Sequence, residues 1–327
     1  MRATVNLATI RATVFGLPIA VVLGFVAGFQ LLGQSRDYEN YLFYFDFVGN
    51  SSWSEVLAYR FEPGFAALSY LLAAFQFSGP SIYSVIVGGS MLVKYLSLRT
   101  TSNFWPTFVV FTIYYLARYF TLFEMTVLRT AVALSIAFFV FYSRKDHECC
   151  GKHLLLLIIS MFFHYSAIIF IPVYLFRSPS RLSVVFAGLA CFVAILSARN
   201  IALAVLPSYV PVFATYHDFT KATILPKPFA VDILFILFAL FMWKNSDSLM
   251  RTCVLGMLIS VSFHFSLLDY SILASRFREL LSVFFLLYIV RSVSFSNNEI
   301  KYITISYAAV SAVLSLYATY IYDPLLV

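Results

Sequence analysis

The chain has 327 residues, of which 61% are hydrophobic and 11% are charged. Charged residues make up about 25% of an ordinary soluble domain, so the composition excludes one. The net charge of +7 would suggest nucleic acid in a soluble protein. Cytoplasmic loops of membrane proteins carry the same excess of lysine and arginine, and we expect no nucleic-acid partner.

Apolar blocks long enough to cross a bilayer as helices run along the whole chain. These blocks do not alternate between polar and apolar residues, as the strands of a membrane barrel do. The sequence therefore predicts an all-α fold, a polytopic transmembrane helical bundle of about 10–11 spans in a single integral membrane domain, residues 1–327. The expected spans are 13–32, 62–78, 81–98, 104–118, 128–142, 153–176, 182–205, 229–243, 250–268, 272–290 and 302–321.

Lysine and arginine set the orientation of the bundle, because they collect on the cytoplasmic side. The basic segments that we place there are the N-terminus, with Arg2 and Arg11, and the loops 144–153, 244–251 and 291–301. Two long aromatic loops, about 33–61 and 206–228, then lie outside. Both are predicted to be recognition surfaces.

Two segments do not fit this pattern as simple crossings. Counting from the N-terminus places Lys94 outside if residues 62–98 cross twice, whereas counting back from the loop 144–153 places it inside. A re-entrant segment within 62–98, or a miscount of the spans, would resolve the conflict. Irregular backbone at membrane depth is tolerated only where it lines a cavity in the protein. The same reasoning favours a hairpin that turns near His164 over one span at 153–176.

Charged side chains in or beside apolar blocks are the candidates for function, because a charge inside a membrane is costly. We expect most of them at the outward end of the bundle. For Arg36 and Arg118 the simpler explanation is a place at the end of a span, and Glu124 fits an ion pair with Arg118 or Arg129 equally well. The candidates are Arg36, Asp37, Glu62, Arg118, Glu124, Arg129, His164, Arg276 and Arg278.

Arginines that converge outside a membrane suit an anionic ligand, since guanidinium pairs with phosphate through two hydrogen bonds and keeps its proton. A carboxylate or histidine nearby could take a proton from an attacking hydroxyl. This combination fits transfer chemistry on a lipid pyrophosphate and fits anion transport equally well. The segment with His147, Cys149, Cys150 and His153 matches no standard zinc spacing, so we expect no metal and no cofactor.

The first outer loop and the residues after it carry two motifs that resemble those of EpsG-type, Wzy-like polysaccharide polymerases. SRDYENYLFYF resembles the D-Y-x-x-Y start of that family and places Asp37, Tyr38 and Tyr41. FEPGF resembles the E-x-G motif and places Glu62 and Gly64.

Three later motifs follow in the order that the same family shows. LRTAVALSIAFFVFYSRK resembles its R-x-x-[LV]-A helix and places Arg129, although Thr130 stands where the family often has glutamine. FFHYSAIIFIP resembles its F-H-x-S-A element and places His164. SRFREL resembles its late arginine element and places Arg276, so the likeness runs from about residue 30 to 290.

The resemblance implies a metal-independent glycosyltransferase of the bacterial inner membrane, with its active site facing the periplasm. Such an enzyme joins oligosaccharide units carried on undecaprenyl pyrophosphate into O-antigen, capsule or exopolysaccharide. Its expected partners are the lipid-linked donor and acceptor, the bilayer and a regulator of chain length. In this reaction Arg129, Arg276 and Arg278 would bind the pyrophosphate leaving group and stabilise its growing charge.

The remaining roles in that reaction concern the acceptor sugar. Asp37, Glu62 or His164 would take the proton from its hydroxyl, and Tyr38 and Tyr41 would stack on sugar faces. Two alternative functions are a flippase or other transporter of lipid-linked polysaccharide and a membrane O-acyltransferase that modifies the glycan. The further candidates for substrate contact are Arg36 and Glu124.

Overall fold

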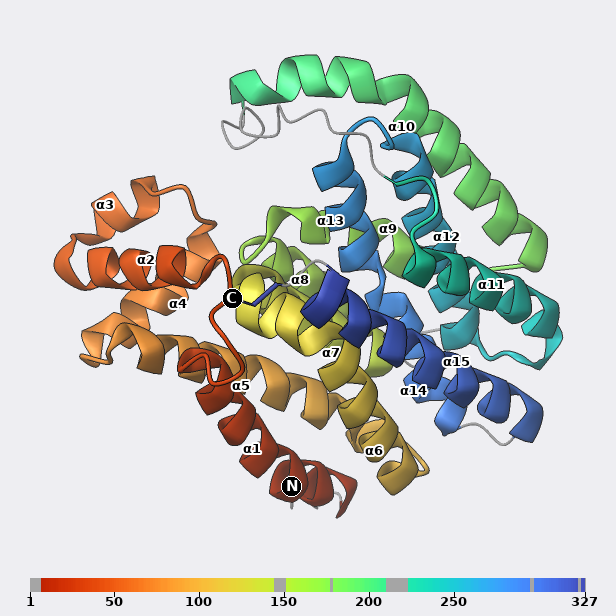
Figure 1. The fold of residues 1–327 in the computed structure, drawn as a ribbon, viewed down its shortest axis with the longest axis horizontal. Coiled ribbons are helices and arrows are strands. Elements are labelled where there is room, and N and C mark those ends of the chain that lie inside the picture. The colour runs from red at the N-terminus through yellow and green to blue at the C-terminus, as the bar shows by residue number, and fades with distance from the viewer. Residues whose placement is uncertain are drawn as a thin grey trace.

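The computed structural model describes residues 7–143, 151–176, 179–209, 223–294, 297–322 and 325–326. Apart from one isolated bridge between Ser35 and Leu326, these residues form helices and the segments that connect them. The predicted all-α polytopic bundle is therefore confirmed (Figure 1). Parts of the predicted loops 144–153 and 206–228 lie outside the described residues, as do His147, Cys149 and Cys150.

A π-helix, Leu116–Thr126, continues α6, and a 3-10 turn, Tyr165–Ile169, precedes α9. The α-helices in chain order are α1 (Leu7–Gly28), α2 (Tyr38–Asn50), α3 (Trp53–Ala58), α4 (Pro63–Ala74), α5 (Gly79–Ser97), α6 (Phe104–Tyr115), α7 (Leu128–Ser143), α8 (Gly151–Met161), α9 (Phe170–Leu175), α10 (Arg181–Tyr209), α11 (Lys227–Phe241), α12 (Ser248–Ser266), α13 (Ser271–Leu281), α14 (Val283–Val293) and α15 (Asn298–Tyr317).

Seven helices within the described residues are long and apolar enough to cross a membrane. They comprise α1, α5, α6 with the π-helix, the first part of α10 (Arg181–Arg199), α11, α12 and α15. Helix α7 has 16 residues and a length of about 24 Å, a little less than the ~30 Å hydrocarbon core. Helices α13 and α14 follow one another with a break at Ser282.

Two of the predicted spans are not single crossings. The segment 62–78 folds into α4, which has 12 residues and a length of about 18 Å. The segment 153–176 is divided into α8, with 11 residues, and α9. The structure thus confirms a hairpin near His164, and within 62–98 it has one full-length helix, α5, preceded by a short one.

The α8–α9 hairpin lies along α7. Backbone angles of φ −159° and ψ 113° at His164 mark its extended tip. At its base, the Tyr174 hydroxyl lies 3.3 Å from Nδ1 of His153. The Tyr174 ring also contacts the ring of Phe141, in the last turn of α7, with 6.0 Å between centroids. The tip is therefore directed toward the first turn of α7.

The bundle has two distinct ends. At the first, which we call the site end, α7 begins and α1 ends against α2, where the Tyr38 hydroxyl donates to Gly28 O at 2.5 Å. At the opposite end, the hydroxyls of Thr101 and Tyr142 are hydrogen-bonded at 2.6 Å, beside the last turn of α7. Figure 1 shows α2, α3 and α4 grouped at the site end, away from α10, α11 and α12.

Candidate active site

Glu62 lies where the chain leaves the first loop and enters α4. It precedes Pro63, whose fixed φ and missing N–H suit the first position of a helix. The extended backbone of Glu62 accepts the first helical hydrogen bond, from Ala66 N at 2.9 Å. This turn directs the carboxylate into the protein, where only 3% of the residue is exposed. A carboxylate buried so deeply needs charged or hydrogen-bonding partners.

Glu62 finds those partners in Arg129 and His164. Arg129, in the first turn of α7, donates through Nη1 to Glu62 Oε2, and Nδ1 of His164 lies 3.3 Å from Oε1. Burial alone would raise the pKa of the Glu62 carboxyl. The hydrogen bond with His164 and the charge of Arg129 outweigh burial, so this pKa is lowered. Together the three residues form what we call the Glu62 centre.

The three members of the Glu62 centre differ in access. The Glu62 side chain is 4% exposed, whereas the side chains of Arg129 and His164 are 22% and 23% exposed. The carboxylate is thus an internal anchor, and the guanidinium and the imidazole are the groups that a ligand can reach.

The lack of a side chain at Gly64 allows the hairpin tip to approach Glu62. Its backbone N–H donates to Phe162 O at 2.8 Å, which docks the start of α4 onto the tip. A Cβ at Gly64 would lie 2.7 Å from that same oxygen, closer than any real Cβ approaches backbone. Only glycine permits this contact, and the contact holds Glu62 and His164 at hydrogen-bonding distance.

An aromatic shell surrounds the guanidinium of Arg129. The Phe61 ring centroid lies 4.4 Å from its central carbon. Tyr41 packs on Phe61 and Phe65, with centroids 5.9 and 6.0 Å apart. Burial raises the pKa of the Tyr41 hydroxyl, while the charge of Arg129 lowers it and the charge of Asp37 raises it. Asp37 and Arg129 therefore both act on this hydroxyl.

The prediction that Tyr38 and Tyr41 stack on sugar faces is wrong. Tyr38 is 8% exposed and donates its hydroxyl to the end of α1, and Tyr41 is 4% exposed. Both rings pack against Tyr83 of α5, so neither face is open to a ligand. The D-Y-x-x-Y motif instead fastens α2 to the bundle. Arg36, in the same loop, is exposed, and Asp37 is half-buried at the start of α2.

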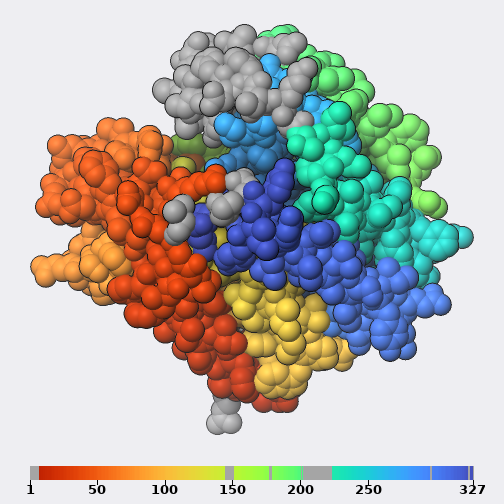
Figure 2. Space-filling view, in the orientation of Figure 1, coloured from red at the N-terminus to blue at the C-terminus, as the bar shows by residue number. Residues whose placement is uncertain are grey.

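Arg276 and Arg278 lie on α13, and the structure gives neither of them a hydrogen bond or an ion pair with the Glu62 centre. Arg276 is exposed. Arg278 is half-buried, with its guanidinium 5.6 Å from the centroid of Phe229. Figure 2 shows a recess between the α2–α4 group and α13, with yellow-green side chains of the α7–α9 region visible between them. The two arginines and the Glu62 centre thus belong to elements that border one recess.

The sequence left two roles open for Glu124, and the first of them, an ion pair with Arg118 or Arg129, is wrong. Glu124 is fully buried on the π-helix and forms an ion pair with Lys94 of α5 at 2.7 Å. The Tyr115 hydroxyl donates to the same carboxylate oxygen at 2.8 Å. Glu124 is enclosed in the bundle, so a direct substrate contact is wrong as well.

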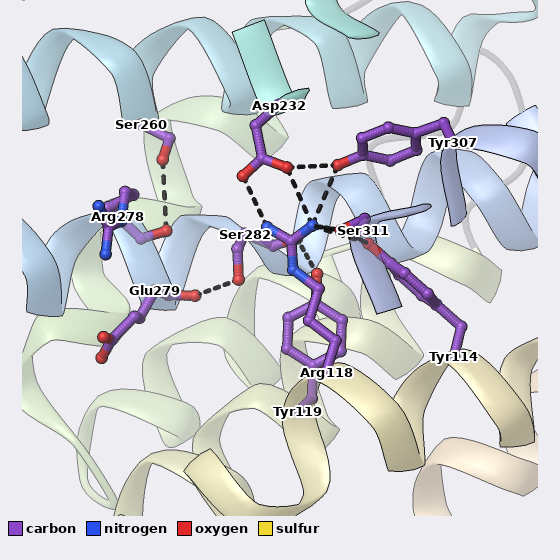
Figure 3. Close-up of polar contacts among 10 residues, drawn as sticks. All are labelled: Tyr114, Arg118, Tyr119, Asp232, Ser260, Arg278, Glu279, Ser282, Tyr307 and Ser311. Atoms are coloured by element: carbon purple, nitrogen blue, oxygen red, sulfur yellow. Dashed lines mark hydrogen bonds and ion pairs between the residues drawn. The ribbon is translucent and has the colours of Figure 1, made fainter. Parts of the chain in front are cut away.

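Arg118 also lies inside the bundle rather than at the end of a span. Its Nη2 lies 2.6 Å from Oδ2 of Asp232 on α11 (Figure 3). The same network includes Tyr307 and Ser311 of α15 and Tyr114 of α6. The sequence interpretation missed Asp232. Its position within the predicted span 229–243 was the available signal, because a charge inside a membrane span needs a partner.

Among the residues that the structure describes, no group of three or more histidine, cysteine or acidic side chains could hold a metal ion. The side chains of the Glu62 centre supply a fixed positive charge, on Arg129, and a proton acceptor, in His164.

Comparison with known proteins supplies the family. A model described as the EpsG family matches residues 13–325. A search of curated proteins and a search of solved structures each found no match. The matched range includes nearly the whole chain and every residue of the Glu62 centre. The chain therefore belongs to the EpsG family.

Proposed function

We propose that this protein is a polysaccharide polymerase of Wzy type, which joins undecaprenyl-pyrophosphate-linked oligosaccharides into O-antigen at the periplasmic face of a bacterial inner membrane. Family membership suggests polymerase-like activity in general. The observation that carries the proposal is the Glu62 centre, in which three separate motifs bring a guanidinium and an imidazole to one accessible point.

The base in this proposal is His164. Its Nδ1 faces the buried carboxylate of Glu62, which leaves Nε2 as the nitrogen that can accept a proton. The acceptor sugar hydroxyl attacks the anomeric carbon of the donor, its proton passes to Nε2, and the bond from that carbon to the pyrophosphate oxygen breaks. Glu62 orients the imidazole and stabilises the imidazolium that forms.

Arg129 is the proposed partner of the leaving group. The pyrophosphate departs with the electron pair of the broken bond, and a guanidinium that keeps its proton stabilises the added negative charge. Arg276 and Arg278 of α13, on the other side of the recess, are suited to the second phosphate or to the second lipid-linked substrate. Asp37 is a further candidate base, because its charge acts on Tyr41 beside Arg129.

The proposed orientation places the site end in the periplasm. Arg99, Lys244, Arg251 and Arg291 all belong to the opposite end of the bundle, and cytoplasmic ends of membrane proteins are enriched in such residues. This side also gives the Glu62 centre access to glycans that have already crossed the membrane.

One observation favours transport of a lipid-linked glycan as a second candidate function. The ion pairs Lys94–Glu124 and Arg118–Asp232 lie within membrane-spanning helices, where transporters place coupling charges. Each of these charges is already paired and enclosed by protein, which favours the polymerase.

The test is a deletion of the gene in the source strain, complemented with the wild-type gene or with Arg129→Ala, and electrophoresis of the surface polysaccharide. We expect the wild-type gene to restore a high-molecular-weight ladder and Arg129→Ala to leave a single repeat unit. Lys152→Ala, an exposed basic residue of α8, is the matched control and should restore the ladder. Loss of every repeat, with lipid-linked units retained inside the cell, would instead identify a transporter.

A further inference from the structure

A pocket of about 550 Å³ lies at the opposite end of the bundle, and the proposed polymerase reaction does not use it. The start of α10, the end of α11 with the turn that follows it, and the first turn of α12 line this pocket. Asp247, next to the pocket in sequence, caps α12 and pairs with Arg291 of α14. Both residues belong to the end of the bundle away from the first turn of α7.

Three cations converge on this pocket. Arg181 comes from α10, Lys244 from the turn after α11 and Arg251 from α12. None of the described residues that line the pocket is acidic, and none of the three cations has an ion pair with another described residue. Asp247, the acidic residue next in sequence, is already engaged by Arg291 and by the N–H of Met250. Like charges held together without a counter-ion repel one another, so an anion here would be stabilising.

The pocket is also built to hold Arg251 in place. The guanidinium carbon of Arg251 lies 5.6 Å from the centroid of Trp243, a geometry that stabilises a cation over an aromatic face. The Nε of Arg251 is buried and has no hydrogen-bond partner within the described residues. A buried donor of this kind calls for an acceptor, and a phosphate oxygen would supply one.

The walls beside the pocket are apolar and open. Leu182 and Phe186 of α10 are 66% and 59% exposed, and Phe241 of α11 is 77% exposed. Side chains of this kind on membrane-spanning helices face acyl chains. Arg181 directly precedes Leu182, and Lys244 follows Phe241 after two residues. The cations therefore stand where a headgroup would meet its acyl chains, with Trp243 at the level where tryptophan favours the interface.

We propose that Arg181, Lys244 and Arg251 form a binding site for the phosphate headgroup of an anionic phospholipid. Basic pockets between transmembrane helices suit such headgroups, because paired hydrogen bonds to phosphate add to the Coulomb attraction. The site is separate from the Glu62 centre and does not depend on the proposed polymerase activity.

The experiment measures binding of phosphatidylglycerol and of phosphatidylcholine to the purified full-length protein in detergent, by native mass spectrometry and by thermal unfolding. We expect wild-type protein to bind phosphatidylglycerol and to unfold at a higher temperature in its presence, with little effect of phosphatidylcholine. Arg251→Gln and Lys244→Gln should each weaken phosphatidylglycerol binding about tenfold or more. Lys152→Gln, an exposed lysine outside the pocket, is the matched control and should bind as wild type does.

Lys244 is exposed, so its substitution keeps the test valid if Arg251→Gln fails to fold. Equal binding of phosphatidylglycerol by wild type and by Lys244→Gln would overturn the site. If inorganic phosphate competes with phosphatidylglycerol and raises the unfolding temperature as much as the lipid does, the proposal of a lipid ligand is overturned. The pocket would then be a site for free phosphate.

Discussion

Replacement of Gly64 by alanine tests whether the contact between α4 and the hairpin tip sets the geometry of the Glu62 centre. The new Cβ would lie 2.7 Å from Phe162 O, and ordinary contact begins at 3.4 Å, so the backbone must move by about 0.7 Å, the difference of the two. That movement acts on the hydrogen bond from Gly64 N and, through the tip, on the 3.3 Å contact of His164 with Glu62.

The expected cost has two parts. Overpacking of this kind destabilises a protein by roughly 1–3 kcal/mol, which the better helix propensity of alanine offsets by up to about 1 kcal/mol. A misplacement near 1 Å at a catalytic group costs about 10²-fold in rate. We therefore expect Gly64→Ala to insert at near-normal levels and to polymerise about 10²-fold more slowly.

The assay is complementation of the deletion strain with quantification of the polysaccharide ladder, alongside the amount of protein in the membrane. Gly89→Ala in α5 is the matched control, because a Cβ there meets nothing within 4 Å. A ladder from Gly64→Ala equal to that from Gly89→Ala would refute the role of this contact.

Three further predictions concern charges. Arg129→Lys should lose most polymerisation despite keeping the charge, because an ammonium cannot offer paired hydrogen bonds; wild-type ladders from this variant would contradict the role. Asp232→Ala should lower the free energy of unfolding by about 3–5 kcal/mol by leaving Arg118 buried and unpaired, and Arg118→Met combined with Asp232→Leu should recover much of it in denaturation experiments; no recovery in the double variant would contradict the argument. The pKa of Glu62 is lowered in the folded protein, so its stabilisation is present above the ordinary value of 4.5 and is lost as the pH falls through the lowered pKa. The difference in melting temperature between wild type and Glu62→Gln should accordingly stay constant near neutral pH and shrink in acid, and a difference that grew in acid would have the wrong sign.

Much of the candidate site could be predicted from the sequence, because each member of the Glu62 centre stands in a short motif of its own. Glu62, Arg129 and His164 were all predicted, and a charge next to an apolar block is a signal that needs no structure. The hairpin at His164 was predicted from the parity of the loops. The meeting of Arg129 and His164 at the Glu62 carboxylate depends on the tertiary packing of α4, α7 and the hairpin. No local sequence pattern contains that packing.

The errors have a common physical cause. Tyr38 and Tyr41 follow a charged loop, and neighbours in sequence did not reveal that α5 covers both rings. The partners considered for Glu124 were the arginines nearest in sequence, whereas its partner in the structure, Lys94, lies 30 residues away on another helix. Partner choice inside a bundle follows helix packing, and helix packing is long-range in sequence.

The route of the α8–α9 hairpin has a consequence for biogenesis. Glu62 and Arg129 are synthesised first and stand at the site end, but the histidine arrives on a hairpin whose base lies at the other end of α7. A chain that has been made only as far as α7 holds the acid and the guanidinium without the imidazole. On the proposed mechanism, such a nascent chain cannot cleave a lipid-linked sugar, and activity begins only when the hairpin has folded back along α7.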